Sequence, residues 1–361
     1  MCGDVMLGRG IDQILPHRGD PVLEEGYVTD AGQYVALAES LNGPIARPVD
    51  FAWSWGESLQ VLDDVAPEAR IINLETSITR SSEFAPGKAV HYRMSPANVP
   101  TLSALHPSVC ALANNHVLDF GRAGLDETLD TLATVGLRAA GAGTDAQRAR
   151  EPAAIALPGG GRLLVFSCGL ASSGIPPDWA ASPTRSGVNL LPSLTDAVAA
   201  VLTTQVSARK RPGDLVVVSV HWGSNWGYDV APEQRRFAHA LIDGGVDIVH
   251  GHSSHHARPV EIYRDKLVVY GCGDFVNDYE GISGYEGFRD DLRVMYFASL
   301  DPAAGVLLDL RMAVMKTHRL SLRDASRSDV QWLQGVLDQV SREYSARVDL
   351  TGEGWLALRQ S

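Results

Sequence analysis

Four short apolar runs recur along the chain, and each is followed by polar residues. The runs cover residues 69–75, 108–116, 214–223 and 246–252. They are rich in β-branched and aliphatic residues and lack strict alternation, which is typical of strands buried on both faces of a sheet. Helix-type patterns lie between and after them, at 123–135, 194–209 and 232–243, the last with Pro in its first turn.

Later segments predict antiparallel pairs. One hairpin is expected over 153–169, turning at Gly159–Gly161, and another over 258–273, turning at Arg264–Asp265. Residues 293–317 read as a further pair, and a helix is expected at about 328–346. Segments 12–60 and 78–100 are less regular and predict long loops over one face. We therefore expect a single domain over 1–361, an α/β/β/α sandwich with a C-terminal helix and tail at about 326–361.

Composition narrows the class of protein. A hydrophobic fraction of 45% with 20% charged residues is ordinary for a soluble globular chain, and the net charge of −12 argues against nucleic-acid binding. The four cysteines have no scaffold spacing, so a reduced, cytoplasmic protein is expected. The sequence shows neither a signal-peptide pattern nor a long apolar run, so no membrane association is expected, although the short first run "MCGDV" leaves open whether residues precede it.

Polar residues cluster directly after the apolar runs. In open α/β sheets the carboxyl ends of the strands form the ligand crevice, so side chains from separate runs should meet at one rim. A mixed oxygen and nitrogen set suits one or two divalent transition ions, of which Mn, Fe, Zn and Co are candidates. The residues in these positions are Asp4, Glu75, Asn114, Asn115, His116, His221, His252 and His255.

Each of these residues also has a structural explanation when it is taken alone. Asp4 could cap a helix, Asn115 could hold a turn, and His221 could be a satisfied core histidine. Four of the eleven histidines fall within 250–256, and at least one of His252, His255 and His256 is expected at the surface. His250 is expected to pack in or near the strand. The joint placement at strand ends is what favours a metal site.

Six motifs, taken together and in this order, resemble the CapA-like proteins, named for poly-γ-glutamate capsule synthesis, which share the calcineurin-like metallophosphoesterase fold. The motifs are "GDVMLGRG", "NLETSIT", "ANNHVLDFG", "HWGSNW", "GHSSHH" and "YGCGDF". The resemblance implies a dinuclear metal centre, with Glu75 bridging the two ions. It implies that Asp4 and His255 bind one metal and that Asn115, His221 and His252 bind the other. It also implies that His116 is an acid or base, with Asp119 orienting it.

The sequence departs from the phosphoesterase pattern at three points, which leaves fewer of the expected metal ligands. Met6 stands where the first motif would have a histidine, and the second motif offers Glu75 in place of an aspartate. The last motif reads Gly-His-Ser-Ser-His, one residue longer than Gly-His-x-His. Phosphoester hydrolysis is therefore not the first expectation.

A metal pair that clamps a carbonyl or carboxylate would acidify the neighbouring Cα–H. We therefore expect a metal-dependent acid/base enzyme, in the first place a peptide epimerase that inverts one Cα centre of a lasso-type precursor peptide. The alternatives are a phosphoester hydrolase or poly-γ-glutamate synthesis protein, and a metal-free binding subunit. The substrate is expected to be a peptide or another anion, and the oligomeric state stays open.

Loops over the rim supply the remaining candidates. Asp12 and His91 are further candidates for the acid/base pair. Arg9 could neutralise an anionic substrate group or form an ordinary surface salt bridge. Trp222 could wall a substrate pocket or pack in the core, which is the commoner use of tryptophan. His256 is a candidate for substrate contact or for support of the metal ligands.

Overall fold

The computed structural model describes residues 1–360 and builds them around two sheets of largely parallel strands. The first sheet has the order β16–β1–β2–β5–β6, and every neighbouring pair in it is parallel. Strand β1 therefore lies between β2 and β16, which follow it far along the chain. The strands are β1 (Asp4–Val5), β2 (Ile71–Leu74), β5 (Val109–Ala111), β6 (Arg138–Ala140) and β16 (Asp274–Val276).

The second sheet has the order β11–β9–β12–β13–β15–β14, with β8 paired to β9. Strands β11, β9, β12, β13 and β15 run parallel, whereas β8 and β14 close antiparallel hairpins on β9 and β15. Both predicted hairpins are confirmed, and Arg264 and Asp265 have the positive φ that a tight turn uses. The strands are β8 (Ala153–Ala156), β9 (Arg162–Leu170), β11 (Leu190–Leu191), β12 (Leu215–His221), β13 (Ile248–His252), β14 (Val260–Tyr263) and β15 (Lys266–Val269).

The buried apolar clusters show how these sheets and helices pack in layers. Val109 of the first sheet and Val165 and Val217 of the second belong to one buried cluster, which fills the space between the sheets. Helices α7 (Asp196–Arg209) and α8 (Pro232–Asp243) cover the outer face of the second sheet, and α5 (Gly121–Thr134) joins the cluster on the outer face of the first. The α/β class is confirmed, and the order helix–sheet–sheet–helix follows from these clusters.

Two segments expected as loops contain regular structure, so that prediction is wrong. Helix α2 (Gly32–Asn42) lies wholly within 12–60, and helices α1 (Gly10–Ile14) and α3 (Ser58–Val65) overlap its two ends. Their apolar residues bury against the first sheet and stabilise short helices that the local pattern marks weakly. The other short elements are β3 (Ser77–Ile78), β4 (Arg93–Met94), α4 (Val99–Leu105), β7 (Ala142–Gly143), α6 (Ala146–Arg150) and β10 (Gly187–Val188).

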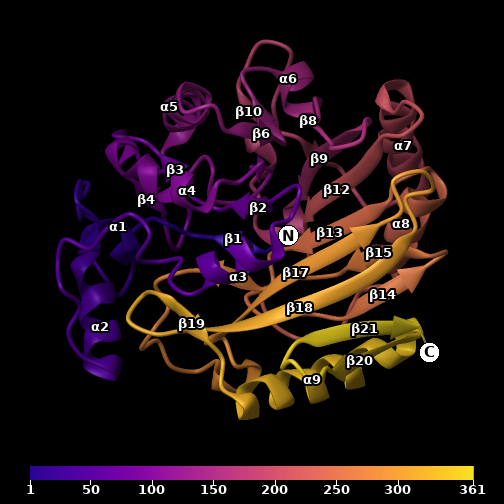
Figure 1. Ribbon diagram of the computed structural model, residues 1–361. Coiled ribbons are helices and arrows are strands. Elements are labelled where there is room, and N and C mark those ends of the chain that lie inside the picture. The colour runs from indigo at the N-terminus through magenta and orange to yellow at the C-terminus, as the bar shows by residue number, and fades with distance from the viewer. Residues whose placement is uncertain (361) are drawn as a thin grey trace.

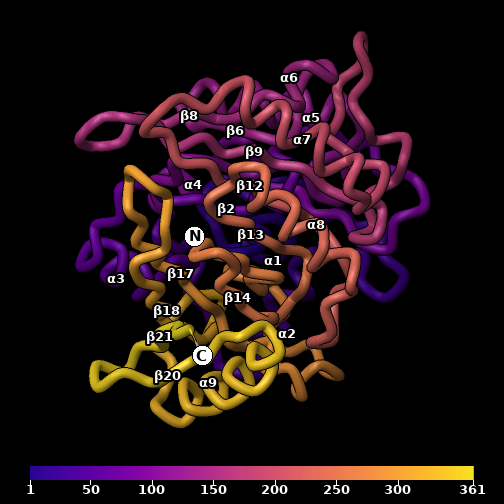
Figure 2. Tube along the Cα trace, turned by 90° about the vertical axis from the view of Figure 1, so that its right-hand side faces the viewer, coloured from indigo at the N-terminus to yellow at the C-terminus, as the bar shows by residue number. Residues whose placement is uncertain are grey.

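A third sheet, β17–β18–β21–β20 with β19 on β18, occupies the lower part of the molecule in Figures 1 and 2. The antiparallel pair predicted over 293–317 is confirmed as β17 (Leu292–Leu300) and β18 (Leu307–Thr317), and β19 covers Leu322–Asp324. Helix α9 (Arg327–Ser341) starts with a capping box between Ser326 and Asp329 and ends earlier than expected.

The C-terminal region is a helix followed by a hairpin, not by an irregular tail. Strands β20 (Ala346–Leu350) and β21 (Leu356–Gln360) pair antiparallel. Their buried residues alternate along each strand, as in Ala346 and Val348, and join the same apolar cluster as α9. No helix within residues 1–360 combines the length and the apolar character needed to cross a bilayer.

Candidate metal centre

The first sheet contributes carboxylates from adjacent parallel strands. Asp4 of β1 pairs in register with Asn73 of β2 on one side and with Asp274 of β16 on the other. Asn73 Nδ2 donates to Asp4 Oδ1 at 2.7 Å and lies 3.2 Å from Glu75 Oε2. Asn114 in turn donates to Asn73 Oδ1 at 3.1 Å. The parallel register thus brings Asp4, Glu75 and Asp274 to one buried point.

The second sheet contributes two histidines from paired positions. His221 and His252 end β12 and β13 opposite one another, and their Nδ1 atoms lie 2.8 Å apart. His221 Nε2 meets Asn115 Oδ1 at 2.8 Å, and His252 Nε2 meets the Ser219 hydroxyl at 2.8 Å. The ligand atoms of Asp4, His221 and His252 all lie within 4.8 Å of one another. We call Asp4, Glu75, His221 and His252 the carboxylate–histidine cluster.

The charges in this cluster fit a divalent cation. Burial, followed by the nearby Asp274 carboxylate, raises the pKa of Asp4 to about 7. Burial and Asp4 likewise raise the pKa of Glu75 well above its usual range. Burial lowers the pKa of His221 and of His252, so both imidazoles are neutral with lone pairs to offer. A cation would relieve the crowded carboxylates, and the oxygen and nitrogen donors suit a transition ion.

His255 reaches the cluster through Asp274. Its Nδ1 donates to Asp274 Oδ1 at 2.9 Å, and its Nε2 lies 3.0 Å from the Asn225 amide. Burial works against charge on this histidine, but Asp274 outweighs it and raises the pKa of His255. Asn277 donates to the other oxygen of Asp274 at 2.6 Å. The structure therefore brings His255 to the side of Asp4 with Asp274 between them.

His116 forms an oriented pair with Asp119 beside the cluster. Its Nδ1 donates to Asp119 Oδ2 at 2.7 Å, and its Nε2 lies 3.7 Å from Glu75 Oε1. Lys88 donates to the other Asp119 oxygen and to the Asn115 carbonyl, and its Nζ lies 3.2 Å from His116 Nδ1. Burial lowers the pKa of His116 to about 4, so the imidazole is neutral near neutral pH. The arrangement suits proton transfer at Nε2.

Comparison with known proteins places the chain in a family. Residues 1–279 match the family described as Bacterial capsule synthesis protein PGA_cap. The chain belongs to this family. A probable polyglutamine synthesis accessory protein from Mycobacterium tuberculosis is 53% identical over 348 residues, which is 96% of this chain and 91% of that relative. The PGA biosynthesis protein CapA from Bacillus subtilis is 28% identical over 297 residues, which is 81% of this chain and 66% of that relative.

Two of the acid/base candidates in this PGA_cap chain do not join the cluster. The Asp12 carboxylate accepts hydrogen bonds from the backbone N–H groups of Gly19 and Ser95 and from the Asn98 side chain. His91 lies with its Nε2 2.8 Å from the Ala85 carbonyl and packs against phenylalanine rings. Both side chains hold loops in place, which explains why the sequence puts polar groups there.

The three residues predicted to bind substrate contact other parts of the protein. Arg9 is buried and bonds Asp278 and Glu25, so it forms neither a surface salt bridge nor a free anion site. Trp222 donates to the Tyr270 carbonyl at 2.9 Å and is 1% exposed, which places it in the core. The ring centroid of His256 lies 4.7 Å from that of Phe288, and its buried Nε2 has no hydrogen-bond partner among residues 1–360, so its predicted role stays a prediction.

His250 packs as expected. Its Nδ1 lies 3.0 Å from the Ser219 hydroxyl, and its Nε2 lies 3.0 Å from the Cys2 carbonyl oxygen. Ser219 therefore contacts both His250 and the cluster residue His252. His250 supports the cluster from within the sheet and does not face it with a free nitrogen.

Several residues in or beside the cluster were not predicted from the sequence. Asp274 carries a visible signal, because the tripeptide Cys-Gly-Asp occurs both at 2–4 and at 272–274, on strands that pair in register. Asn73 sits inside an apolar run and resembles an interruption of a strand. Lys88, Tyr92 and Tyr279 lie in irregular segments that give no periodic signal.

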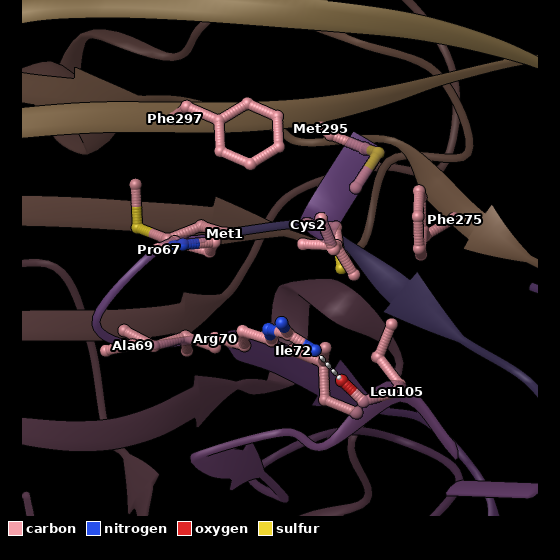
Figure 3. A pocket seen from close by; sticks show the side chains of 12 residues that line it. Met1, Cys2, Pro67, Ala69, Arg70, Ile72, Leu105, Phe275, Met295 and Phe297 are labelled. Atoms are coloured by element: carbon pink, nitrogen blue, oxygen red, sulfur yellow. Dashed lines mark hydrogen bonds between the residues drawn. The ribbon is translucent and has the colours of Figure 1, made fainter. Parts of the chain in front are cut away.

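A small cavity of about 30 Å³ lies away from the cluster, beside the start of the chain (Figure 3). Its lining is apolar apart from Arg70, whose Nη1 donates to the Leu105 carbonyl at 2.8 Å. A space of this size holds about one water molecule and offers few polar partners. It is a gap in packing and does not compete with the cluster as a functional site.

Proposed function

We propose that this protein is a metal-dependent accessory protein of poly-γ-glutamate synthesis that binds and acts on γ-glutamyl chains. The observation that carries the proposal is the buried approach of Asp4, His221 and His252 beside the His116–Asp119 pair. The PGA_cap family and the names of the relatives favour this substrate class over other anions. Catalysis itself is part of the proposal.

The proposed architecture is the calcineurin-like α/β/β/α sandwich, in which metal ligands gather where the strands of two sheets end. The residues suited to hold one or two ions are Asp4, Glu75, Asn115, His221, His252 and His255, with Asp274 added. Mn, Fe, Zn and Co are all compatible with these donors. A bound divalent ion would polarise a carbonyl or carboxylate oxygen of the substrate.

The acidic character of the chain supports a role for the metal in substrate binding. A net charge of −12 repels a polyanion such as poly-γ-glutamate at long range. A local cation in a buried cluster can reverse this repulsion at short range, because buried charges are screened less than exposed ones. Binding of γ-glutamyl chains should therefore depend on metal.

His116 is the proposed proton carrier. Asp119 accepts from its Nδ1, which leaves Nε2, the atom nearest Glu75, to take up or release a proton at the reacting group. Against the effect of burial, His116 and Lys88 lower the pKa of Asp119, and Lys88 also holds the carboxylate by a hydrogen bond. The reaction class that fits these groups is cleavage or transfer at a γ-glutamyl amide.

The test uses purified protein reconstituted with Mn²⁺ and incubated with poly-γ-glutamate, and it follows chain length and new amino termini. We expect shortening or transfer with the wild type and its loss in His116→Ala. The exposed His17→Ala is the matched control and should behave as wild type. Full activity in His116→Ala, or no metal-dependent change of the polymer, would reject catalysis at this site. Turnover of an aryl phosphate instead of the polymer would favour the hydrolase alternative.

Peptide epimerisation, the first expectation from the sequence, finds no support among the relatives, whose names favour the poly-γ-glutamate alternative. It stays a prediction with its own readout. An epimerase would introduce one deuteron from deuterated water at a single Cα of its peptide. The expected cytoplasmic location likewise stays a prediction.

A further inference from the structure

Two tyrosines join the two histidine-bearing sides of the site. Tyr92 Oη donates to Tyr279 Oη at 2.7 Å. The Tyr92 ring meets the His116 ring edge-on, with centroids 4.4 Å apart at 87°, and the Tyr279 ring lies 5.3 Å from the His255 ring. The hydroxyl pair therefore spans the space between the proposed proton carrier and the histidine that contacts Asp274.

Tyr92 is held rigidly. It is 1% exposed, and its backbone N–H donates to Asp119 Oδ2 at 2.6 Å. The guanidinium carbon of Arg9 lies 4.3 Å from the Tyr92 ring centroid and 5.8 Å from that of Tyr279. Arg9 has a φ of 47°, a strained value for a residue with a Cβ, and is fixed by Asp278 and Glu25. The buried ion pairs thus position the tyrosines.

Tyr279 differs from Tyr92 in having a proton to give. Its hydroxyl oxygen accepts from Tyr92, and among residues 1–360 no acceptor takes the proton of Tyr279 itself. Tyr279 is also the partly exposed member of the pair. A phenol has an ordinary pKa of about 10 and is protonated at neutral pH. A fixed donor without an acceptor, beside His255, is suited to an oxygen of a ligand.

We propose that the phenol O–H of Tyr279 donates a hydrogen bond to an anionic oxygen of the bound ligand, with Tyr92 and Arg9 as positioning residues. That this oxygen belongs to a γ-glutamyl carboxylate rests on the proposed function. The hydrogen bond from Tyr279 to an anionic oxygen does not depend on that function. Inorganic phosphate and a γ-glutamyl tripeptide present the same chemistry from two sources and can be compared.

Isothermal titration of Mn²⁺-loaded protein with each of the two probes tests the inference. Tyr279→Phe should bind the same probes as the wild type, but with an affinity about tenfold to a hundredfold lower. This is the effect of losing a hydrogen bond to a charged group. Tyr92→Phe should weaken binding less, because it removes only the support. Tyr263→Phe, which removes a phenol hydroxyl from another sheet edge, is the matched control and should bind as wild type. Manganese content should be the same in all four proteins.

The outcomes separate this inference from the proposed function. Binding of phosphate but not of the γ-glutamyl tripeptide, weakened in Tyr279→Phe, would support the tyrosine contact and count against poly-γ-glutamate as the substrate. Equal binding by the wild type and Tyr279→Phe, or no binding of either probe by the wild type, would overturn the contact. If Tyr279→Phe fails to fold, Tyr279→Met replaces it under the same criteria.

Discussion

His221 Nδ1 lies 2.8 Å from His252 Nδ1, at the paired ends of two parallel strands. The opposite nitrogens are engaged by Asn115 and by Ser219, so the two Nδ1 atoms face one another across a buried gap. Two neutral imidazole nitrogens at this distance share a proton or a cation. With Asp4 close by, the pair is the most direct structural argument for metal binding.

Metal content should depend on these side chains. We expect the wild type, after reconstitution and desalting, to retain stoichiometric Mn²⁺, Zn²⁺, Fe²⁺ or Co²⁺, and His221→Ala and His252→Ala to lose it. Asn73→Ala removes the hydrogen bonds that position Asp4 and Glu75 but no proposed ligand, and it should lower metal affinity by about tenfold to a hundredfold. Elemental analysis measures the content. A wild type without metal would instead favour the binding-subunit hypothesis.

Removal of metal should lower stability. A ligand that binds only the folded state at a hundred times its dissociation constant adds about 2.7 kcal/mol to the free energy of unfolding. We therefore expect thermal unfolding to shift to lower temperature when a chelator is added and to recover with excess Mn²⁺. His252→Ala serves as the control. An equal response to chelator in that variant would show that the stabilising metal sits elsewhere.

Loss of the His116 imidazole should affect turnover more than binding. General acid/base groups contribute about 100-fold to 10,000-fold, so His116→Ala should lower kcat on γ-glutamyl polymer by that factor with little change in KM. Asp119→Asn should change kcat in the same direction, because Asp119 orients His116 Nδ1. Steady-state kinetics on the metal-loaded proteins measure both. A variant that changes KM alone would place His116 in substrate binding.

Arg9 should be essential for stability. Removing one partner of a buried ion pair typically costs about 3–5 kcal/mol, because the remaining charges are left unpaired. Arg9→Met leaves Asp278 and Glu25 in that state and should lower the free energy of unfolding in urea by about this amount. Arg47→Met breaks the exposed pair with Glu39 and should cost at most about 1 kcal/mol. Equal effects of the two changes would contradict the buried role of Arg9.

Asp338 should stabilise the C-terminal hairpin in a pH-dependent way. Hydrogen bonds from Arg347, with further ones from Arg342 and the Val348 N–H, lower the pKa of Asp338 below its usual range. A depressed folded-state pKa means that its stabilisation is present above the usual aspartate pKa of about 3.9 and is lost as the pH falls below it.

The Asp338→Asn variant checks this sign. Because the arginines are largely exposed, we expect it to cost only about 1–2 kcal/mol at neutral pH. Urea unfolding at several pH values should show the gap between wild type and variant narrowing as the pH falls through the acid range. If the difference in unfolding free energy between wild type and variant did not change with pH, the stabilisation would come from packing and not from the charge of Asp338.

The sequence predicted the histidines of the cluster for a physical reason. His221 and His252 directly end long apolar runs, and parallel strands align their carboxyl ends, so a local pattern was enough to bring them together. The same reasoning placed Asp4 and Glu75. The central strands were predicted because burial on both faces produces uniform apolar runs, and α8 was predicted from its helical spacing with Pro in the first turn.

Residues whose position depends on the path of the chain could not be predicted in this way. Tyr92 and Tyr279 meet only because Arg9 and its carboxylate partners fold separate loops against one another. Helices α2 and α3 have short apolar faces that gain their stability from the first sheet. The β20–β21 hairpin could not be predicted, because its two strands have only five residues each and follow closely on a strong helix pattern.

Strand β1 has one neighbour from the early chain, β2, and one from about 200 residues later than β2, β16 (Asp274–Val276). During synthesis on the ribosome, Asp4 therefore emerges long before Asp274, its partner in register. A nascent chain can shape the β2 side of the site but not the β16 side. Assembly of the candidate metal site thus requires synthesis of the chain through β16, and a product that terminates before residue 274 would lack this side of the site.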